Sequence, residues 1–267
     1  MRGEETDARL EVGMEDEFRK IFDTIPEQFD RYRPRYSPEL FAYLIGAAGI
    51  GRDTPVLEIG PGTGQATEPI LQTGCGYHAI ELGENLAQAM RRKYGGYPNF
   101  HIVHDDFITH DFGSMRFDLI YSAATIQWIP EKIAFEKTFA LLNPGGTLAM
   151  MLTKGDYKTP NEALFEEIQQ VYARYFKPEI PYTHGAFRYE NAVSYGFTDF
   201  EKYEFYGKRV MTADAYAAYS GTHCDHIVIP EPEKSLLLNG LRDAVLNAGN
   251  RIEFRDTYVL YLAKKPL

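Results

Sequence analysis

Residues 55–67 read PVLEIGPGTGQAT. The first five residues are apolar except for Glu58, and glycines follow at positions 60, 62 and 64. A short apolar run bounded by glycine is typical of a buried strand. Glycine permits positive φ and leaves no Cβ between the backbone and a ligand. The stretch predicts a strand whose following loop lies against a ligand, and a dinucleotide, a phosphate and a sulfonium nucleoside all suit such a loop.

Apolar segments continue to alternate with amphipathic ones after this stretch. We expect further strands at 77–82, 100–107, 117–124 and 146–153, and helices at 64–73, 85–94 and 131–142. This alternation is typical of a parallel, doubly wound sheet with helices on both faces. Two more strand-like segments, 202–211 and 251–265, close the chain. The sequence therefore predicts an α/β fold with seven strands.

The remaining segments suggest how the chain is organised. Ser37 is placed to cap a helix that begins at Pro38. We expect residues 1–30 to form an N-terminal lead-in and residues 31–267 to form one domain, with insertions at about 155–195 and 212–250. Residues 157–219 hold 10 of the 19 tyrosines and 6 of the 17 phenylalanines. We therefore expect a helical, aromatic-rich cap over the ligand edge of the sheet.

The composition of the chain argues against some classes of binding partner. The net charge is −10, whereas a nucleic-acid surface normally carries a basic excess. Cys75 and Cys224 form no CxxC motif, which indicates free thiols in a reducing compartment. The first 20 residues lack the apolar core of a signal peptide, and the longest uncharged run, 138–153, is broken by Pro-Gly-Gly. We expect a cytoplasmic protein that binds a small molecule, with neither nucleic acid nor membrane as partner, and its oligomeric state stays open.

Two carboxylates help to choose between the ligands. Glu81 ends the second strand, 19 residues after Gly62, where it can accept hydrogen bonds from ribose hydroxyls. That position suits both a nicotinamide dinucleotide and S-adenosylmethionine. Glu58 would repel a pyrophosphate but attract the ammonium group of a methionine moiety. Gln65 occupies the place of the last glycine in the dinucleotide pattern G-x-G-x-x-G. Both residues favour S-adenosylmethionine.

A set of five motifs carries a family resemblance. In order, VLEIGPGTGQAT, AIELGENL, VHDDF, FDLIYSAATIQWIP and LLNPGGTLAM resemble the successive motifs of the class I S-adenosylmethionine-dependent methyltransferases. The resemblance covers about residues 31–153. FDRYRPRYSPEL and QWIP resemble the small-molecule branch that includes trans-aconitate methyltransferase. The resemblance implies a Rossmann-like, mostly parallel sheet of seven strands with an antiparallel C-terminal strand.

The resemblance also implies roles for single residues. Glu81 would hold the ribose, Asp106 would accept from the adenine amino group, and Arg33 would pair with the methionine carboxylate. Gln127 and Trp128 would lie near the transferred methyl group and position it, and no general base is implied. The implied cofactor-binding residues are Tyr32, Arg33, Glu58, Gly60, Pro61, Gly62, Gly64, Glu81, Leu82, Asp106, Phe107, Ser122 and Ala123.

The acceptor is less constrained by the sequence. A small-molecule acceptor, with a carboxylate among the candidates, needs mainly alignment with the methyl group and exclusion of water. The cluster His223-Cys224-Asp225-His226 resembles a metal site, but adjacent ligands rarely converge on one ion, so we expect no metal there. Candidate substrate contacts are Tyr182, His184, Arg188, Tyr219 and His223.

Two other functions stay open. A nicotinamide-dependent oxidoreductase would need a Tyr-x-x-x-Lys pair or another acid at the hydride site. Tyr172, Tyr189, Tyr203 and Tyr206 have no lysine four residues later. A protein that binds S-adenosylmethionine without catalysis is the other alternative, because the family has no obligatory base whose loss would reveal it.

Overall fold

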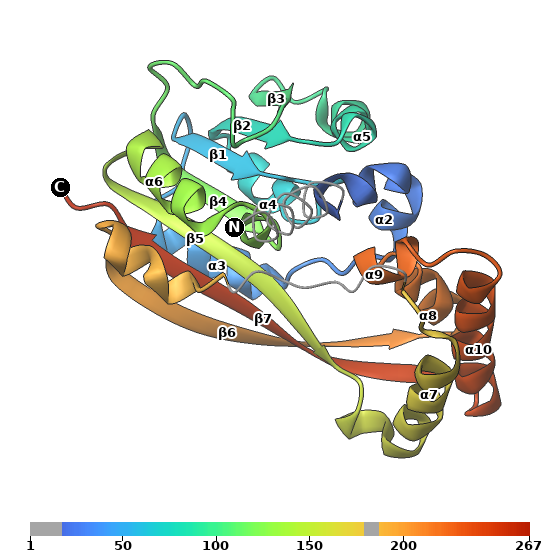
Figure 1. Cartoon of the computed structure of the whole chain (residues 1–267). Coiled ribbons are helices and arrows are strands. Elements are labelled where there is room, and N and C mark those ends of the chain that lie inside the picture. Colours follow the sequence, from blue (N-terminus) through green and yellow to red (C-terminus); the bar gives the residue numbers. More distant parts are fainter. Residues whose placement is uncertain (1–17, 179–186) are drawn as a thin grey trace, which may run out of the picture.

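The computed structural model describes residues 18–178 and 187–267. Its centre is one seven-stranded sheet in the order β3-β2-β1-β4-β5-β7-β6 (Figure 1). The first five strands are parallel, and β7 runs antiparallel to both β5 and β6. This confirms the predicted α/β, doubly wound fold. The strands are β1 Pro55–Ile59, β2 Gly76–Glu81, β3 Phe100–His104, β4 Phe117–Ala123, β5 Leu142–Asp156, β6 Thr198–Met211 and β7 Ile252–Lys264.

Helices cover both faces of the sheet. Leu40 and Leu44 of α3, Ile70 of α4 and Met90 of α5 lie in one buried cluster with β1 and β4 side chains. Phe135 of α6 lies in the cluster on the other face. The helices and short 3-10 turns of this part are η1 Ile21–Thr24, α2 Pro26–Tyr32, α3 Pro38–Ala47, α4 Thr67–Leu71, α5 Glu84–Tyr94, η2 Ile126–Trp128, α6 Glu131–Leu141 and η4 Tyr189–Tyr195.

The helix starts follow local chemistry where that chemistry is strong. The Ser37 side chain accepts from the Leu40 N–H and Pro38 is the first residue of α3, as predicted. The helix expected at 64–73 is shorter, because α4 begins only at Thr67. The residues before it continue the glycine-rich loop, whose glycines take positive φ. A helix of five residues adds little dipole charge at the loop.

Strand β5 is longer than the sequence suggests. The sequence predicts a strand only from residue 146, yet the strand begins at Leu142. The Gly145 N–H donates to the Lys265 carbonyl, and the Lys265 N–H donates to the Gly146 carbonyl, each at 2.9 Å. Lys265 thus supplies hydrogen-bond partners for Gly145 and Gly146, whose sequence is typical of a turn. Tertiary pairing here overrides local propensity.

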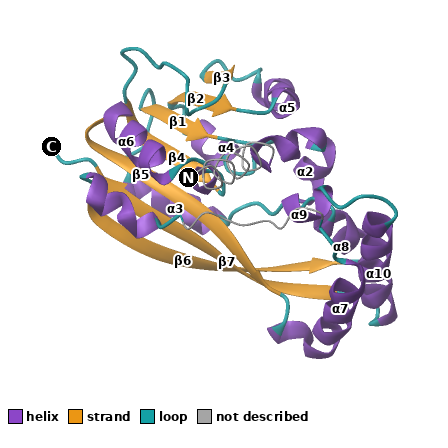
Figure 2. Cartoon of the chain, in the orientation of Figure 1, coloured by secondary structure: helices purple, strands orange, loops and turns teal. Residues whose placement is uncertain are grey.

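A helical cap stands on the far ends of β5, β6 and β7 (Figures 1 and 2). It has its own buried cluster, which includes Ile168, Tyr216, Leu237 and Leu241 with Phe254 of β7. Many rings of the aromatic-rich segment pack in this cluster, so they build the interior of the cap. Its elements are η3 Thr159–Asn161, α7 Glu162–Tyr175, α8 Ala213–Ser220, α9 Cys224–Ile227 and α10 Glu233–Asn247. No helix among the described residues has the length and hydropathy to span a membrane.

Candidate cofactor and acceptor site

A cavity of about 340 Å³ lies at the carboxyl ends of the central strands. Its walls come from the loops that follow β1, β2, β3 and β4, together with the N-terminal segment and the cap. Strand β1 lies between β2 and β4, so the strand order reverses beside it. Ligands of open α/β sheets bind at such a reversal, and the volume is in the range of small-molecule sites.

Two of the three glycines in the quoted stretch shape the cavity wall. Gly60 and Gly62 line it with φ of +63° and +60°. A Cβ on Gly60 would lie 2.3 Å from Thr125 Cγ2, and one on Gly62 would lie 3.1 Å from Phe29 Cε1. Gly64 does not line the cavity; its Cβ would lie 2.6 Å from Tyr94 Cε2. The third glycine therefore lets the loop pack against α5.

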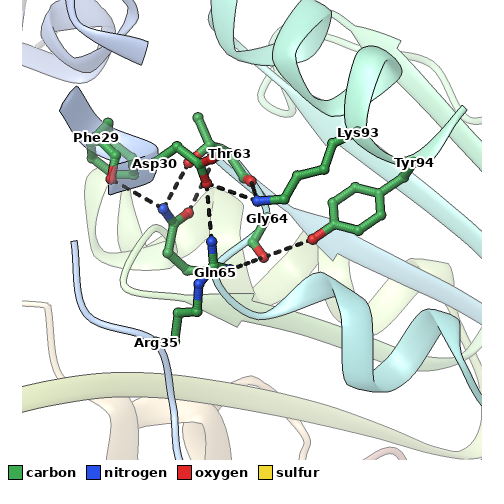
Figure 3. A network of polar contacts seen from close by, with 8 residues as sticks. All are labelled: Phe29, Asp30, Arg35, Thr63, Gly64, Gln65, Lys93 and Tyr94. Atoms are coloured by element: carbon green, nitrogen blue, oxygen red, sulfur yellow. Dashed lines mark hydrogen bonds and ion pairs between the residues drawn. The ribbon is translucent and has the colours of Figure 1, made fainter. Parts of the chain in front are cut away.

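The loop is fastened by polar contacts to residues of α2 and α5 (Figure 3). Gln65 Nε2 donates to Thr63 Oγ1 at 2.7 Å and to the Phe29 carbonyl at 3.4 Å. Lys93 Nζ donates to the Thr63 carbonyl at 3.1 Å and pairs with Asp30 at 2.8 Å. Gln65, which takes the place of a final glycine, thus ties the loop to α2. These contacts hold the backbone of the loop in place before any ligand arrives.

Glu81 is the central carboxylate of the site. It is 5% exposed and accepts from the Gly62 N–H and the Gly83 N–H, each at 2.9 Å. Burial raises its pKa to about 7, although the two backbone hydrogen bonds act in the opposite direction. Each oxygen keeps a further lone pair for a hydroxyl donor. The geometry fits the pair of ribose hydroxyls that the sequence predicts.

The N-terminal segment closes over the neighbouring part of the cavity. Arg19 donates to both oxygens of Asp106, at 2.6 and 3.1 Å. Burial opposes ionisation, but hydrogen bonds from Arg19 and from the Ile108 N–H keep the pKa of Asp106 below its ordinary value. Asp23 accepts from the Leu86 N–H at 2.9 Å and so anchors η1 on α5. The predicted adenine acceptor is therefore already engaged by an arginine.

Glu58 lies deeper than the sequence suggests. It is fully buried and is not among the residues that line the cavity. Its Oε2 accepts from the hydroxyls of Thr67 at 2.6 Å, Tyr121 at 2.7 Å and Tyr77. Its Oε1 is buried with no hydrogen-bond partner among the described residues. Burial raises its pKa. That it attracts a methionine ammonium stays a prediction.

A second group of side chains lines the same cavity. These residues are Tyr36, Thr153, Arg209, Tyr219 and Cys224. Arg209 forms a bidentate ion pair with Asp256, which is 1% exposed. Burial raises the pKa of the Cys224 thiol to about 11 and also raises the pKa of Tyr36. At neutral pH both side chains are protonated, so neither serves as a ready base.

Arg33 also lines the cavity and lies between aromatic rings. Its guanidinium is 5.4 Å from the Phe22 ring centroid and 5.3 Å from that of Phe29. Its Nη2 donates to the Thr222 carbonyl at 2.5 Å, and its Nε is buried without an acceptor in the described part of the chain. Burial lowers its pKa. The fit to a carboxylate ligand is good, because no carboxylate of residues 18–178 or 187–267 pairs with this guanidinium.

The predicted site residues divide into three groups. Tyr182 and His184 lie outside the described residues. Arg188 does not line the cavity, and its N–H donates to Glu131 at 3.0 Å. The predicted residues that line the cavity are Arg33, Gly60, Pro61, Gly62, Glu81, Leu82, Asp106, Phe107, Ala123, Gln127, Trp128 and Tyr219. Those described but absent from its walls are Tyr32, Glu58, Gly64, Ser122, Arg188 and His223.

The side chains of His223, Asp225 and His226 do come together. Their ligand atoms lie within 4.8 Å of one another. His226 Nδ1 contacts the Ser220 carbonyl at 2.7 Å, and its ring is 2% exposed. The rings of Tyr219 and His223 meet edge to face at 4.8 Å. This contact puts His223 directly behind a cavity residue, and its role as a substrate contact stays a prediction.

Trp128 provides a readout of binding, because it is the one tryptophan in the sequence. It lines the cavity and meets Phe22 edge to face at 6.0 Å. We expect S-adenosylhomocysteine to change the tryptophan emission in a saturable titration, since the ligand would alter the polarity around this ring. The Trp128→Phe protein should give no such signal while binding by calorimetry persists. An emission that stays constant while calorimetry reports binding would contradict the placement of the ligand next to Trp128.

Sequence reasoning missed several residues of the cavity. Arg19 and Phe22 fall in the segment expected to be a lead-in, and Arg209 falls in a strand where alternate residues face solvent. A signal for Arg209 was present: Asp256 interrupts the apolar strand 251–265, and a buried carboxylate requires a cation. For Arg19 no comparable signal exists in the sequence.

Part of this chain resembles known methyltransferases. Residues 57–148 match a family described as "Methyltransferase domain". A 65-residue stretch is 37% identical to ribosomal RNA small subunit methyltransferase A of Dehalococcoides mccartyi, and a 55-residue stretch is 44% identical to that of a Synechococcus strain. These stretches cover 24% and 21% of this chain. The chain spans only 22% and 20% of the length of these curated relatives.

Solved structures extend the likeness to the whole fold. The phosphoethanolamine N-methyltransferase 2 of Haemonchus contortus, in complex with phosphomonomethylethanolamine and S-adenosylhomocysteine, superposes with a TM-score of 0.55 at 17% identity. The match covers 92% of this chain and 58% of that one. The YcgJ protein of Bacillus subtilis gives a TM-score of 0.57 at 12% identity, over 86% of this chain and 100% of that one. Residues 57–148 thus resemble a methyltransferase domain, and the chain shares the Rossmann-like fold of these solved structures, of which the Haemonchus contortus protein was solved with S-adenosylhomocysteine.

Proposed function

We propose that this protein transfers a methyl group from S-adenosylmethionine to a carboxylate oxygen of a small molecule. The observation that carries the proposal is one cavity whose walls hold two unlike groups of residues. The first group comprises the glycine loop, Glu81 and Asp106, and the second comprises Arg209, Tyr219 and Cys224. A donor and an acceptor bound in one cavity meet in a fixed orientation, which is the main requirement of methyl transfer.

Each residue that would hold the cofactor has a defined role. Glu81 accepts from the ribose hydroxyls while its bonds to Gly62 and Gly83 fix its position. Arg33 pairs with the methionine carboxylate, which would give this guanidinium the carboxylate partner that it lacks among the described residues. Asp106 accepts from the adenine amino group once Arg19 yields one of its two bonds. Gln127 and Trp128 border the methyl group.

The second group of lining residues favours an acceptor that arrives without a proton. The bound cofactor supplies an activated methyl on a sulfonium. Tyr36 and Cys224 stay protonated at neutral pH, so they do not remove a proton from an alcohol or an ammonium. A carboxylate needs no base: its oxygen forms the bond to the methyl carbon, the sulfur keeps the electron pair of the broken bond, and no proton is released. The products are a methyl ester and S-adenosylhomocysteine.

Other acceptors and functions receive less support. The curated relatives act on ribosomal RNA by their names, but the shared stretches cover at most a quarter of this chain. A net charge of −10 is unfavourable for binding RNA. A dinucleotide would place a pyrophosphate on the glycine loop next to Glu58, which opposes the oxidoreductase alternative.

The test has two stages. Calorimetry with S-adenosylmethionine and S-adenosylhomocysteine should give binding at micromolar to submillimolar concentration. Incubation with the radiolabelled donor and a metabolite extract should then yield base-labile label, as expected for a methyl ester. Absence of binding by both ligands at millimolar concentration would refute the cofactor site. Label in added ribosomal RNA alone would favour an RNA acceptor, and binding without any transfer would favour a non-catalytic protein.

A further inference from the structure

Strand β6 forms one outer edge of the sheet (Figure 1). It spans the 14 residues of Thr198–Met211, and its one strand partner among residues 18–178 and 187–267 is β7. An edge strand presents a row of N–H and C=O groups that can pair with a further strand. Strands of globular proteins usually have about 3–10 residues, so this edge is long. It therefore offers an extended surface for a partner strand.

The side chains of β6 alternate between two environments. From Lys202 to Met211 exposed residues follow half-buried ones without interruption, as expected for a strand with one solvent-facing side. Tyr206 stands in the middle of the exposed row and is 73% exposed. Charged residues flank it on both sides. The exposed row reads, in order, Lys202, Glu204, Tyr206, Lys208 and Val210.

This row is self-complementary in an antiparallel arrangement. A two-fold axis through Tyr206 brings a second copy of β6 alongside the first and places Glu204 of each copy opposite Lys208 of the other. Tyr206 then lies opposite its own counterpart. Pairs of opposite charge and pairs of aromatic rings are favourable cross-strand neighbours. The axis also lies at the midpoint of residues 201–211, over which the register with β7 is unbroken, so the pairing can use all of this stretch.

Neighbouring registers are less favourable. An axis through residue 205 would place Lys202 opposite Lys208, and an axis through either member of the charged pair would place that charge opposite itself. Like charges directly opposite each other are destabilising. An axis through residue 207 avoids like charges but brings no opposite charges together. An axis nearer the start of the strand meets the irregular register at residues 198–201, which shortens the ladder.

The contacts that these charges make within the chain are weak. Lys202 Nζ lies 2.5 Å from Glu204 Oε1, and Lys208 Nζ lies 2.8 Å from Glu253 Oε2. The Lys202, Glu204 and Lys208 side chains are 45%, 36% and 59% exposed. Ion pairs between exposed side chains contribute about 0–1 kcal/mol. Exchanging them for contacts with a second copy therefore costs little.

We propose that the chain forms a two-fold symmetric dimer in which β6 of one copy pairs antiparallel with β6 of the other, centred on Tyr206. The sheets of the two copies join across this edge, and the unpaired backbone groups of β6 gain partners. Arg209, which lines the cavity, lies on the same strand. The dimer thus fixes a strand that supplies part of the cavity wall. It depends neither on the acceptor nor on methyl transfer.

Sedimentation equilibrium on the full chain measures the dimer directly. The mass of the wild-type protein should rise from one chain towards two between about 1 and 100 µM. Glu204→Lys and Lys208→Glu each turn both contacts across the axis into like-charge pairs, so each should weaken the dimer about tenfold or more. The double variant reverses both charges and should recover the wild-type dissociation constant within about threefold. An equal mixture of the two single variants should dimerise more tightly than either alone, because each offers the charge that the other lacks.

A matched pair of controls separates strand pairing from net charge. Glu136→Lys and Lys132→Glu make the same charge changes in α6, where the two side chains are 58% and 75% exposed. They should leave the dissociation constant unchanged. If Glu136→Lys weakened the dimer as much as Glu204→Lys, net charge rather than strand pairing would govern association. A wild-type protein that stays monomeric at about 100 µM would overturn the proposal.

The variants also test the register. If the mixture of Glu204→Lys and Lys208→Glu associates no better than its components, the axis does not pass through Tyr206. Tyr206→Glu gives a second test of the axis should either single variant fail to fold, because its side chain is largely exposed. It would place two carboxylates opposite each other and should also weaken the dimer. A Tyr206→Glu protein with the wild-type dissociation constant would contradict the proposed interface.

Discussion

Replacing Gly60 with alanine is expected to abolish binding of S-adenosylmethionine and to lower the free energy of unfolding by about 2–5 kcal/mol. The residue has φ of +63°, which costs an L-residue about 1–2 kcal/mol. The new Cβ would also lie 2.3 Å from Thr125 Cγ2 and 2.8 Å from its Oγ1, and overpacking of this kind costs about 1–3 kcal/mol. Thr125 Oγ1 donates to the Gly60 carbonyl at 2.9 Å, so the clash displaces the loop itself. Calorimetry and urea unfolding measure the two losses.

Gly49 offers a matched control. Its φ of +62° equals that of Gly60 within a degree, yet no heavy atom lies within 4 Å of a Cβ built on it. Gly49→Ala should therefore show only the conformational cost, about 1–2 kcal/mol, and should keep the wild-type affinity for the cofactor. If the two variants lost equal stability and both bound S-adenosylmethionine, the close approach to Thr125 would not be what Gly60 provides.

The sequence predicted the fold because its signals are local and repeated. β1, β2 and β4 are short, mostly apolar runs, and each is followed by a helix whose buried side is apolar. The topology of such units admits few arrangements. The loop after β1 and the carboxylate that ends β2 then lie side by side through strand pairing, with Glu58 opposite Ala79. This brought Gly62 and Glu81 into contact without further information.

The sequence could not predict contacts that depend on long separations. Arg19 meets Asp106 across 87 residues, and Arg209 meets Asp256 across 47. The packing of the N-terminal segment brings the first pair together. The second pair depends on the antiparallel pairing of β6 with β7, in which Gly207 lies opposite Asp256, and although Asp256 signals that a cation is needed, the sequence does not say which one. For Glu58 the sequence suggested a contact that the structure does not show. Its position in the motif suggested a ligand contact, while three hydroxyl groups from α4, β2 and β4 hold its carboxylate in the interior.

Affinity for S-adenosylmethionine is expected to rise about tenfold between pH 6 and pH 8 in the wild-type protein. Burial raises the pKa of Glu81 to about 7 in the folded protein. Ribose hydroxyls donate to the ionised carboxylate, so binding favours the form without the proton. As the pH rises through 7, the free protein loses that proton and the affinity increases; below 7 the ligand must first displace it. Calorimetry across this range measures the slope.

Glu81→Gln tests the assignment, because the amide is neutral at every pH and its nitrogen cannot accept. The affinity should fall by about 1–3 kcal/mol through the lost charge-assisted bonds, and the part of the pH dependence due to Glu81 should vanish. The amino group of S-adenosylmethionine titrates equally in both proteins, so the ratio of their affinities isolates the carboxylate. Glu84→Gln makes the same exchange at an exposed residue of α5 and should preserve the wild-type profile. A Glu81→Gln protein with the wild-type slope would mean that another group titrates and that the ribose is held elsewhere.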